Sequence, residues 1–315
     1  KQATFYKEYG RGDQRELTTG LEQGLITAVA DLKNLYNETM TYQMSLALYE
    51  DGRLEKITTK DVEMEAGAQS QEQVQIDVPY LEGGAHLLKL MVWEKEGLAP
   101  VANAAVLEDE MRDLLEEAVL SRGDFTRIQQ AMQKAKRGED IYVAALGGSI
   151  TEGAGASGEE FRYATLVKDW WERKFPDSEI QFTNAGIGAT NSYLGVHRVW
   201  ENVLSKGDVD FMVIDYGVND AADESIRPQY EQLVRTVLKE KNAPGVMLLF
   251  MTLNTGGNSQ AEQGAIGEHY GLPMISFRDA IWPKIQDGTF TWESLFADTV
   301  HPNNGGHLLI SRMIG

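Results

Sequence analysis

Four polar residues in the last two thirds of the chain have the types that acyl transfer to a serine requires. Ser149 follows the apolar run IYVAAL and two glycines, and Asn219 stands in the segment GVND. Asp298 and His301 are three residues apart in DTVHPN. A serine hydroxyl is a weak nucleophile and needs an imidazole to accept its proton. The imidazole needs a carboxylate to fix its tautomer, and Asp298 is near enough to His301 to form that pair within one loop.

Attack on a carbonyl creates an oxyanion, which needs N–H donors that are already in place. The segment NAGIGATNS (184–192) is rich in small residues, so its backbone amides can face a ligand. We therefore expect an oxyanion hole that combines the amide of Ser149, an amide of this segment and the side chain of Asn219. The sequence leaves open whether Gly188 or Ala189 supplies the second amide.

The elements that position these loops follow from the hydrophobic periodicity. Helical patterns at 106–120 and 124–138 are followed by strands at 141–146, 179–184, 210–216, 245–252 and 273–276. These strands alternate with helices near 161–175, 192–205, 227–241, 259–270, 277–287 and 305–314. Near-continuous apolar strands separated by helices predict a mostly parallel sheet covered on both faces. The loops after the strands then meet at one edge, where open α/β sheets build their sites.

The first hundred residues have a different pattern. Runs at 24–36, 41–57, 72–81 and 85–97 alternate between apolar and polar residues, and turn signals at Asp51-Gly52 and Gly83-Gly84 separate strands. Asp-Gly between alternating runs is a strong hairpin signal. The spacing predicts a small antiparallel β-sandwich. We expect this accessory domain to cover residues 1–105 and the α/β domain, with its leading helices, to cover residues 106–315.

The composition excludes several classes of function. The 315 residues include 29 Lys and Arg against 48 Asp and Glu, a net charge of −19 without a basic patch, so a nucleic-acid partner is not expected. No apolar run is long enough to span a membrane. Cysteine is absent, and the remaining ligand types show no metal spacing, so we expect neither a cofactor nor a metal.

The chain begins at Lys1 without a methionine or signal peptide, as expected for a processed or excised protein. The other histidines are expected to be structural: His86, His197, His269 and His307.

Taken in order, GGSIT, NAGIGATNS, GVND and DTVHPN resemble the four sequence blocks of the SGNH, or GDSL-type, hydrolases. The resemblance covers about residues 124–315. It implies a flavodoxin-like three-layer α/β/α fold and ester hydrolysis through Ser149, Asp298 and His301. It also implies that Asn219 and an amide of the second block form the oxyanion hole. Two positions depart from the family pattern: Gly148 stands where Asp is frequent, and Ala189, which still has an N–H, stands where many members have Gly.

The segments QQAMQKAKRGEDIYVAALGGSITEG and LLKLMVWEKEGLAPVANA are further similar to bacterial, often secreted, members that deacetylate plant polysaccharides and carry a β-domain. This resemblance implies a carbohydrate O-acetylesterase with an acetylated carbohydrate as its partner and a secreted or cell-surface location. Tyr193, Tyr216 and Trp292 lie in or beside the site loops and are candidates to stack on sugar.

Two alternatives remain on sequence. One is a lipid or thioester hydrolase of the same family, and the other is a non-catalytic carbohydrate-binding module with the same fold. The site loops consist of Gly, Asn, Ser and Thr without a long apolar stretch, which favours acetate over a long acyl chain. The polysaccharide, the hydroxyl position and the oligomeric state stay open.

Overall fold

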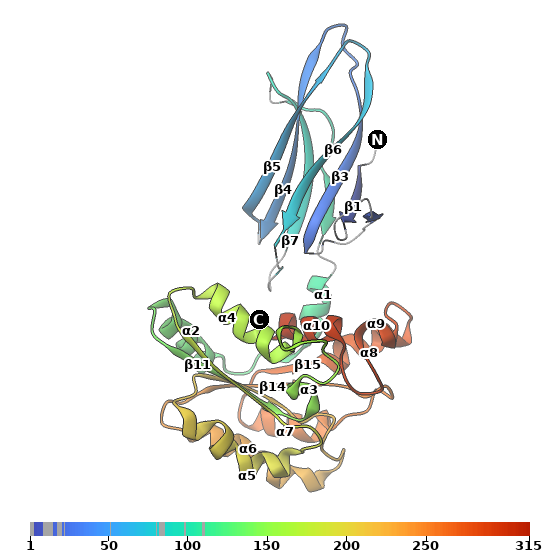
Figure 1. Cartoon of the computed structure of the whole chain (residues 1–315). Coiled ribbons are helices and arrows are strands. Elements are labelled where there is room, and N and C mark those ends of the chain that lie inside the picture. The colour runs from blue at the N-terminus through green and yellow to red at the C-terminus, as the bar shows by residue number, and fades with distance from the viewer. Residues whose placement is uncertain are drawn as a thin grey trace. The chain divides into compact units, whose positions relative to one another are not determined.

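The structure is a computed structural model that describes residues 3–8, 15–17, 21, 23–50, 52–79, 81, 86–97, 99–108 and 111–315. The chain divides into two compact units, residues 1–113 and 114–315 (Figure 1). Within the described residues, no helix has both the length and the apolar character to cross a lipid bilayer.

The first unit consists of antiparallel strands. Its strands are β1 (Thr4–Glu8), β2 (Arg15–Leu17), β3 (Gly24–Lys33), β4 (Met40–Glu50), β5 (Arg53–Met64), β6 (Gln69–Val78), β7 (His86–Glu94), β8 (Ala99–Pro100) and β9 (Ala105–Glu108). One sheet has the order β2-β1-β3-β6, and the other has the order β5-β4-β7-β8 with β9 also pairing with β7. Buried side chains of both sheets form one hydrophobic cluster, to which β3 contributes Ile26 and β4 contributes Met44. The prediction of an antiparallel, sheet-rich N-terminal part is confirmed.

The predicted hairpin lies between β4 and β5, where Glu50 pairs with Arg53 across a two-residue connection. Gly52 has a φ of +78°, a conformation that glycine adopts without steric cost. Asp51 and the predicted turn at Gly83-Gly84 lie outside the described residues. Strand β5 continues to Met64, beyond the predicted end at residue 57. Nearly all of its side chains from Arg53 to Asp61 are exposed, so the segment lacks the apolar alternation that marks a half-buried strand.

The predicted helix at 106–120 is wrong in extent. Residues 105–108 form β9, Met111–Glu117 form α1, and Val119–Ser121 form a short strand, β10. Of the residues of this segment that the structure describes, seven are helical, because its two ends pair with sheets: β9 pairs with β7, and β10 pairs with β15 (Met274–Ser276).

The second unit is built on a six-stranded sheet with the order β10-β15-β14-β13-β11-β12. Its remaining strands are β11 (Ile141–Gly147), β12 (Ile180–Gly186), β13 (Phe211–Asp215) and β14 (Gly245–Phe250). All pairs are parallel except the edge pair of β10 with β15. Along the chain, the five parallel strands have the spatial order 2-1-3-4-5, which is the flavodoxin-like arrangement. This confirms the predicted fold class and places the topological switch point at β11, between β12 and β13.

Helices cover both faces of this sheet (Figure 1). They are α2 (Thr126–Lys136), α3 (Ser149–Glu152), α4 (Tyr163–Lys174), α5 (Ser192–Asn202), α6 (Arg227–Leu238), α7 (Gln260–His269), α8 (Phe277–Gln286), α9 (Trp292–Leu295) and α10 (Asn304–Ile314). Helices α5, α6 and α7 pack on one face, while α2, α4, α8 and α10 lie on the other. Every residue of β11, β13 and β14 is buried, as expected for strands covered on both sides. The loops that follow β11, β12 and β13 therefore emerge together at the switch point, where such folds bind ligands.

Candidate active site

Two glycines bring the end of β11 against the neighbouring loop. A Cβ on Gly147 would collide with the Thr151 hydroxyl and the Asp215 carbonyl. A Cβ on Gly148 would lie 2.5 Å from Oδ1 of Asn219. The glycine pair thus allows the β11 and β13 loops to approach each other, and it places Ser149 at the start of α3 beside Asn219.

A continuous hydrogen-bonded chain joins the three residues that the sequence predicted to work together. Oγ of Ser149 lies 2.8 Å from Nε2 of His301, and Nδ1 of His301 lies 2.7 Å from Oδ2 of Asp298. With Nδ1 donating to the carboxylate, Nε2 presents its lone pair to the serine hydroxyl. The His301 loop is joined to the segment after Ser149, because the Ser157 amide donates to Oδ1 of Asn304 at 2.9 Å.

Asp298 is held as a carboxylate by its own loop. Burial alone would raise its pKa, but hydrogen bonds from the His301 side chain and from the amides of His301 and Val300 lower the pKa to about 2. Both amides lie 2.8 Å from Oδ1. Trp292 stacks on Phe296, and its indole N–H donates to the Asp298 carbonyl at 2.6 Å. Asp298 therefore stays ionised and oriented although its side chain is 54% exposed.

The hydrogen bonds of the four consecutive amides of residues 187–190 distinguish Gly188 from Ala189 as candidates for the second oxyanion donor. The Ile187 amide donates to the Gly147 carbonyl, and the Thr190 amide donates to the Ile187 carbonyl. The Gly188 amide donates to Oε2 of Glu152 at 2.8 Å. The Ala189 amide has no acceptor among residues 114–315, all of which the structure describes. Ala189 also has a φ of +57°, which is costly for a residue with a Cβ. The free and strained position is thus Ala189.

Asn219 and Asp220 have different surroundings. The amide of Asn219 donates to the Tyr216 carbonyl, which ends β13 in a tight turn, and its side chain lies against Gly148. Asp220 accepts hydrogen bonds from the Ser192 amide at 2.9 Å and from the Gln263 side chain at 2.8 Å. Asp220 therefore fixes the start of α5, and Asn219 is the member of the pair whose side chain lies against Gly148, the residue before Ser149.

Arg198 on α5 connects the ends of three strands. Its guanidinium donates to the Ala185 carbonyl at 2.6 Å, to the Gly147 carbonyl at 2.7 Å and to the Tyr216 hydroxyl at 2.8 Å. It also reaches the Thr190 hydroxyl at 3.3 Å. Charge-assisted bonds of this kind are stronger than neutral ones, so one side chain fixes the β11, β12 and β13 loops relative to one another. The sequence contained no motif that singled out Arg198 or Glu152.

A buried polar cluster joins α3 to the end of β13 and the start of α4. The Thr151 hydroxyl contacts Oδ2 of Asp215 at 3.2 Å and the Tyr163 hydroxyl at 2.8 Å. Oδ1 of Asp215 has no hydrogen-bond partner among the residues that the structure describes. Burial, opposed by hydrogen bonds from Thr151 and the Gly217 amide, raises the pKa of Asp215 to about 7. His307 stacks on Tyr163, and burial lowers its pKa to about 4.

The three aromatic candidates for sugar stacking have different positions. Tyr216 has no exposed surface, because its ring lies in the core under α5 and its hydroxyl accepts from Arg198, so its predicted sugar contact is wrong. Trp292 has one ring face covered by Phe296 and supports the Asp298 loop. Tyr193 is 54% exposed on α5 and remains available to a ligand.

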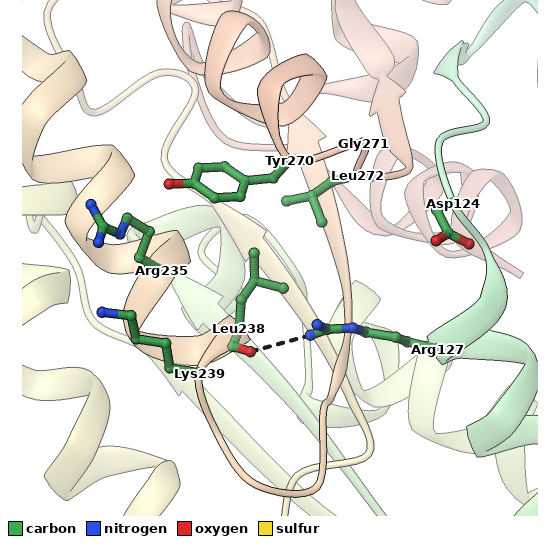
Figure 2. Close-up of a pocket in the computed structure, with 8 residues that line it drawn as sticks. All are labelled: Asp124, Arg127, Arg235, Leu238, Lys239, Tyr270, Gly271 and Leu272. Carbon is green, nitrogen blue, oxygen red and sulfur yellow. Dashed lines mark hydrogen bonds between the residues drawn. The ribbon is translucent and has the colours of Figure 1, made fainter.

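A cavity of about 330 Å³ lies between the start of α2 and the ends of α6 and α7 (Figure 2). Because α6 and α7 lead into β14 and β15, this cavity is at the sheet edge opposite Ser149. Arg127 donates to the Leu238 carbonyl at 3.3 Å, as the dashed line in Figure 2 marks, and Arg235 pairs with Glu231 at 3.6 Å. These cations stabilise the C-terminal end of α6, which accounts for the basic lining without a ligand.

A crystal structure of CEX, a two-domain esterase active on acetylated mannans, matches with 38% identity and a TM-score of 0.62 over 64% of this chain. The same values hold for CEX co-crystallised with mannopentaose. The match covers 54% of the CEX chain, so this protein spans about half the length of that esterase. A search of curated proteins returned no match.

The model of the GDSL-like lipase/acylhydrolase family matches residues 145–309, which is more than half of the 315-residue chain. This range begins in β11, just before Ser149, and ends in α10, after His301. It therefore contains all the loops that meet at the switch point. The chain belongs to the GDSL-like lipase/acylhydrolase family.

Proposed function

We propose that this protein is a serine esterase that removes O-acetyl groups from carbohydrate. Ser149 is the nucleophile, His301 is the general base and acid, and Asp298 orients His301. The observation that carries this proposal is the unbroken chain of hydrogen bonds from the Asp298 carboxylate through His301 to the Ser149 hydroxyl, at 2.7 and 2.8 Å.

In the first half of the reaction, Nε2 of His301 accepts the proton of Ser149 as Oγ bonds to the acetyl carbonyl carbon. The carbonyl oxygen becomes an oxyanion, and the donors aimed at it are the amides of Ser149 and Ala189 and the side-chain amide of Asn219. We assign the second amide to Ala189, since the Gly188 amide already donates to Glu152. The imidazolium then protonates the sugar oxygen as the ester C–O bond breaks.

In the second half, His301 accepts a proton from water while the water oxygen bonds to the acetyl carbon. The bond to Oγ of Ser149 breaks, acetate leaves, and the proton returns to Ser149. Asp298 remains ionised in both halves, because its pKa of about 2 is far below neutral pH. Its negative charge stabilises the imidazolium that forms in each half.

Two observations support acetylated carbohydrate as the substrate class. The 38% identical two-domain esterase is active on acetylated mannans. The loops around Ser149 consist of small and polar residues, which fit a short acyl group and polar sugar hydroxyls. A plant polysaccharide is met outside the cell, so the proposal includes a secreted or cell-surface location.

The test is acetate release from acetylated mannan together with labelling by a fluorophosphonate probe. We expect the probe to add to Ser149, the Ser149→Ala variant to lose both labelling and acetate release, and the exposed Ser205→Ala control to keep both. p-Nitrophenyl acetate should be hydrolysed much faster than the octanoate ester. Labelling or turnover that persists in Ser149→Ala would contradict the assigned nucleophile, and a preference for octanoate would contradict the substrate class.

A further inference from the structure

Exposed apolar side chains of the second unit gather beside the candidate active site. Seven large hydrophobic side chains of residues 114–315 are exposed, and four of them lie between residues 187 and 200: Ile187, Tyr193, Leu194 and Trp200. Tyr193 is 54% and Trp200 is 59% exposed. Exposed apolar side chains that gather in one short segment mark a binding site more often than scattered single residues do.

Three of the side chains in this region form a continuous stripe along one helix. Tyr193, His197 and Trp200 occupy positions i, i+4 and i+7 of α5, which lie on one helix face. All three are exposed, and the rings of Tyr193 and His197 meet edge to face with centroids 4.9 Å apart. At about 1.5 Å per residue, the stripe extends over roughly 10 Å. That length is comparable with a disaccharide.

The near end of this aromatic stripe is fixed to the catalytic loops. Helix α5 begins two residues after Ala189–Thr190, and its N-cap Asn191 accepts a hydrogen bond from the Leu194 amide. The Ser192 amide donates to Asp220, the residue after Asn219. The stripe therefore begins beside the proposed oxyanion hole and leads away from it on a rigid element.

We propose that the aromatic stripe Tyr193–His197–Trp200 is a binding subsite for the neutral hexose chain that carries the acetyl group. This inference rests on the proposed function and extends it from the acyl group to the polymer. Aromatic faces stack on the C–H faces of sugar rings while the sugar hydroxyls stay in water, and the amphipathic Tyr and Trp suit such a half-wet contact.

Charge and area distinguish this occupant from two others. The chain has a net charge of −19, which repels an acidic polysaccharide, whereas a neutral hexose chain needs no opposite charge on the stripe. Half-exposed aromatic side chains offer on the order of 100 Å² each, since a fully buried one contributes about 150–250 Å². The whole patch thus provides a few hundred Å², well below the ~800 Å² per partner of a stable protein interface.

The test compares kcat/KM along a ladder of acetylated manno-oligosaccharides, from the monosaccharide to the pentasaccharide, with p-nitrophenyl acetate as a reference. In the wild-type protein, kcat/KM should rise with chain length. Trp200→Ala should lower the ratio of the pentasaccharide value to the reference value by roughly tenfold. Trp200→Phe should restore most of that ratio. Phe125→Ala, which removes an exposed aromatic at the opposite sheet edge, should leave the ladder unchanged.

A binding measurement keeps the inference testable even if the esterase assignment fails. Ser149→Ala protein should be retarded by unacetylated mannan in affinity electrophoresis, and adding Trp200→Ala should remove most of the retardation. The inference would be overturned if kcat/KM rose equally with chain length in wild type and Trp200→Ala. It would also be overturned if Trp200→Ala lowered kcat/KM by the same factor on the pentasaccharide and on p-nitrophenyl acetate. Stronger retardation by an acidic polysaccharide, or a wild-type dimer that Trp200→Ala dissociates, would assign the stripe to another partner. Absence of any ester hydrolysis by the wild-type protein would refute only the proposed function.

Discussion

Two buried groups of the polar cluster at α3, Asp215 and His307, make opposite contributions to stability as pH changes. Burial raises the pKa of Asp215 from its ordinary value of 3.8 to about 7, so the folded protein holds a proton there that the unfolded chain releases. Stability from this group is present below pH 3.8 and is lost as pH rises to 7. Burial lowers the pKa of His307 from 6.5 to about 4. Stability from His307 is present above pH 6.5 and is lost as pH falls to 4.

Between pH 4 and 6.5 the two contributions nearly cancel. Each changes the free energy of unfolding by about 1.4 kcal/mol per pH unit, one downward and one upward as pH rises. Over this interval each amounts to about 3 kcal/mol. Asp215→Asn removes one of them and keeps an oxygen for the Thr151 hydroxyl, which lies 3.2 Å from Oδ2. We therefore expect the stability of Asp215→Asn relative to wild type to increase by about 3 kcal/mol from pH 4 to pH 6.5.

The assay is urea unfolding followed by tryptophan fluorescence at several pH values. Five of the six tryptophans lie in residues 114–315, so the signal reports mainly on the unit that contains Asp215. Taking the difference from wild type at each pH cancels the contributions of the other carboxylates. His307→Gln should show the opposite trend, and the exposed Asp208→Asn should show a flat difference. If the Asp215→Asn difference is the same at pH 4 and pH 6.5, then Asp215 is not protonated in the folded protein and this reasoning fails.

Three further substitutions test the loops around Ser149. Asn219→Ala should lower kcat on p-nitrophenyl acetate by roughly a hundred- to a thousandfold with a smaller change in KM, as for a donor used in the transition state; an unchanged kcat would exclude it from the oxyanion hole. Ala189→Gly should keep kcat within about twofold. It should raise the free energy of unfolding by up to about 1 kcal/mol, because it relieves the φ of +57°. A loss of stability would show that the position is unstrained. Arg198→Lys should lower kcat about tenfold at similar KM, since an ammonium cannot replace the planar guanidinium that joins three strand ends. Full activity would mean that the guanidinium is dispensable. Arg137→Lys is the surface control.

The sequence predicted the strands of the α/β unit and their common edge because most of these strands, β11, β13, β14 and β15, are buried on both faces and appear as apolar runs. The strands at 141–147, 180–186 and 245–250 begin and end within two residues of the predicted bounds. Local pattern was insufficient where a strand has no apolar face of its own. The exposed half of β5 and the three-residue β10 form because a neighbouring strand supplies their hydrogen bonds.

Ser149 and Asn219 were predicted because each follows a buried strand, β11 or β13, and Asp298 and His301 were predicted because their spacing lets them pair within one loop. Tyr216 was misplaced for a related reason. It follows β13 directly and is adjacent to the loop of Asn219, but its ring turns into the core, where Arg198 binds its hydroxyl. Which way a side chain points at the end of a strand depends on its partners across space, and the partner here is on α5.

The same dependence explains why the sequence left Gly188 and Ala189 equivalent. Both have a backbone N–H, and neither has a functional side chain. The distinction comes from Glu152, which lies three residues after Ser149 on α3 and accepts the Gly188 amide, while the Ile187 and Thr190 amides donate to backbone carbonyls. The carboxylate thus occupies the Gly188 amide and leaves the Ala189 amide, at the strained position, without an acceptor among residues 114–315 and available to the proposed oxyanion hole. A residue on the helix of the proposed nucleophile, Ser149, therefore determines which amide of the neighbouring loop is left without an acceptor.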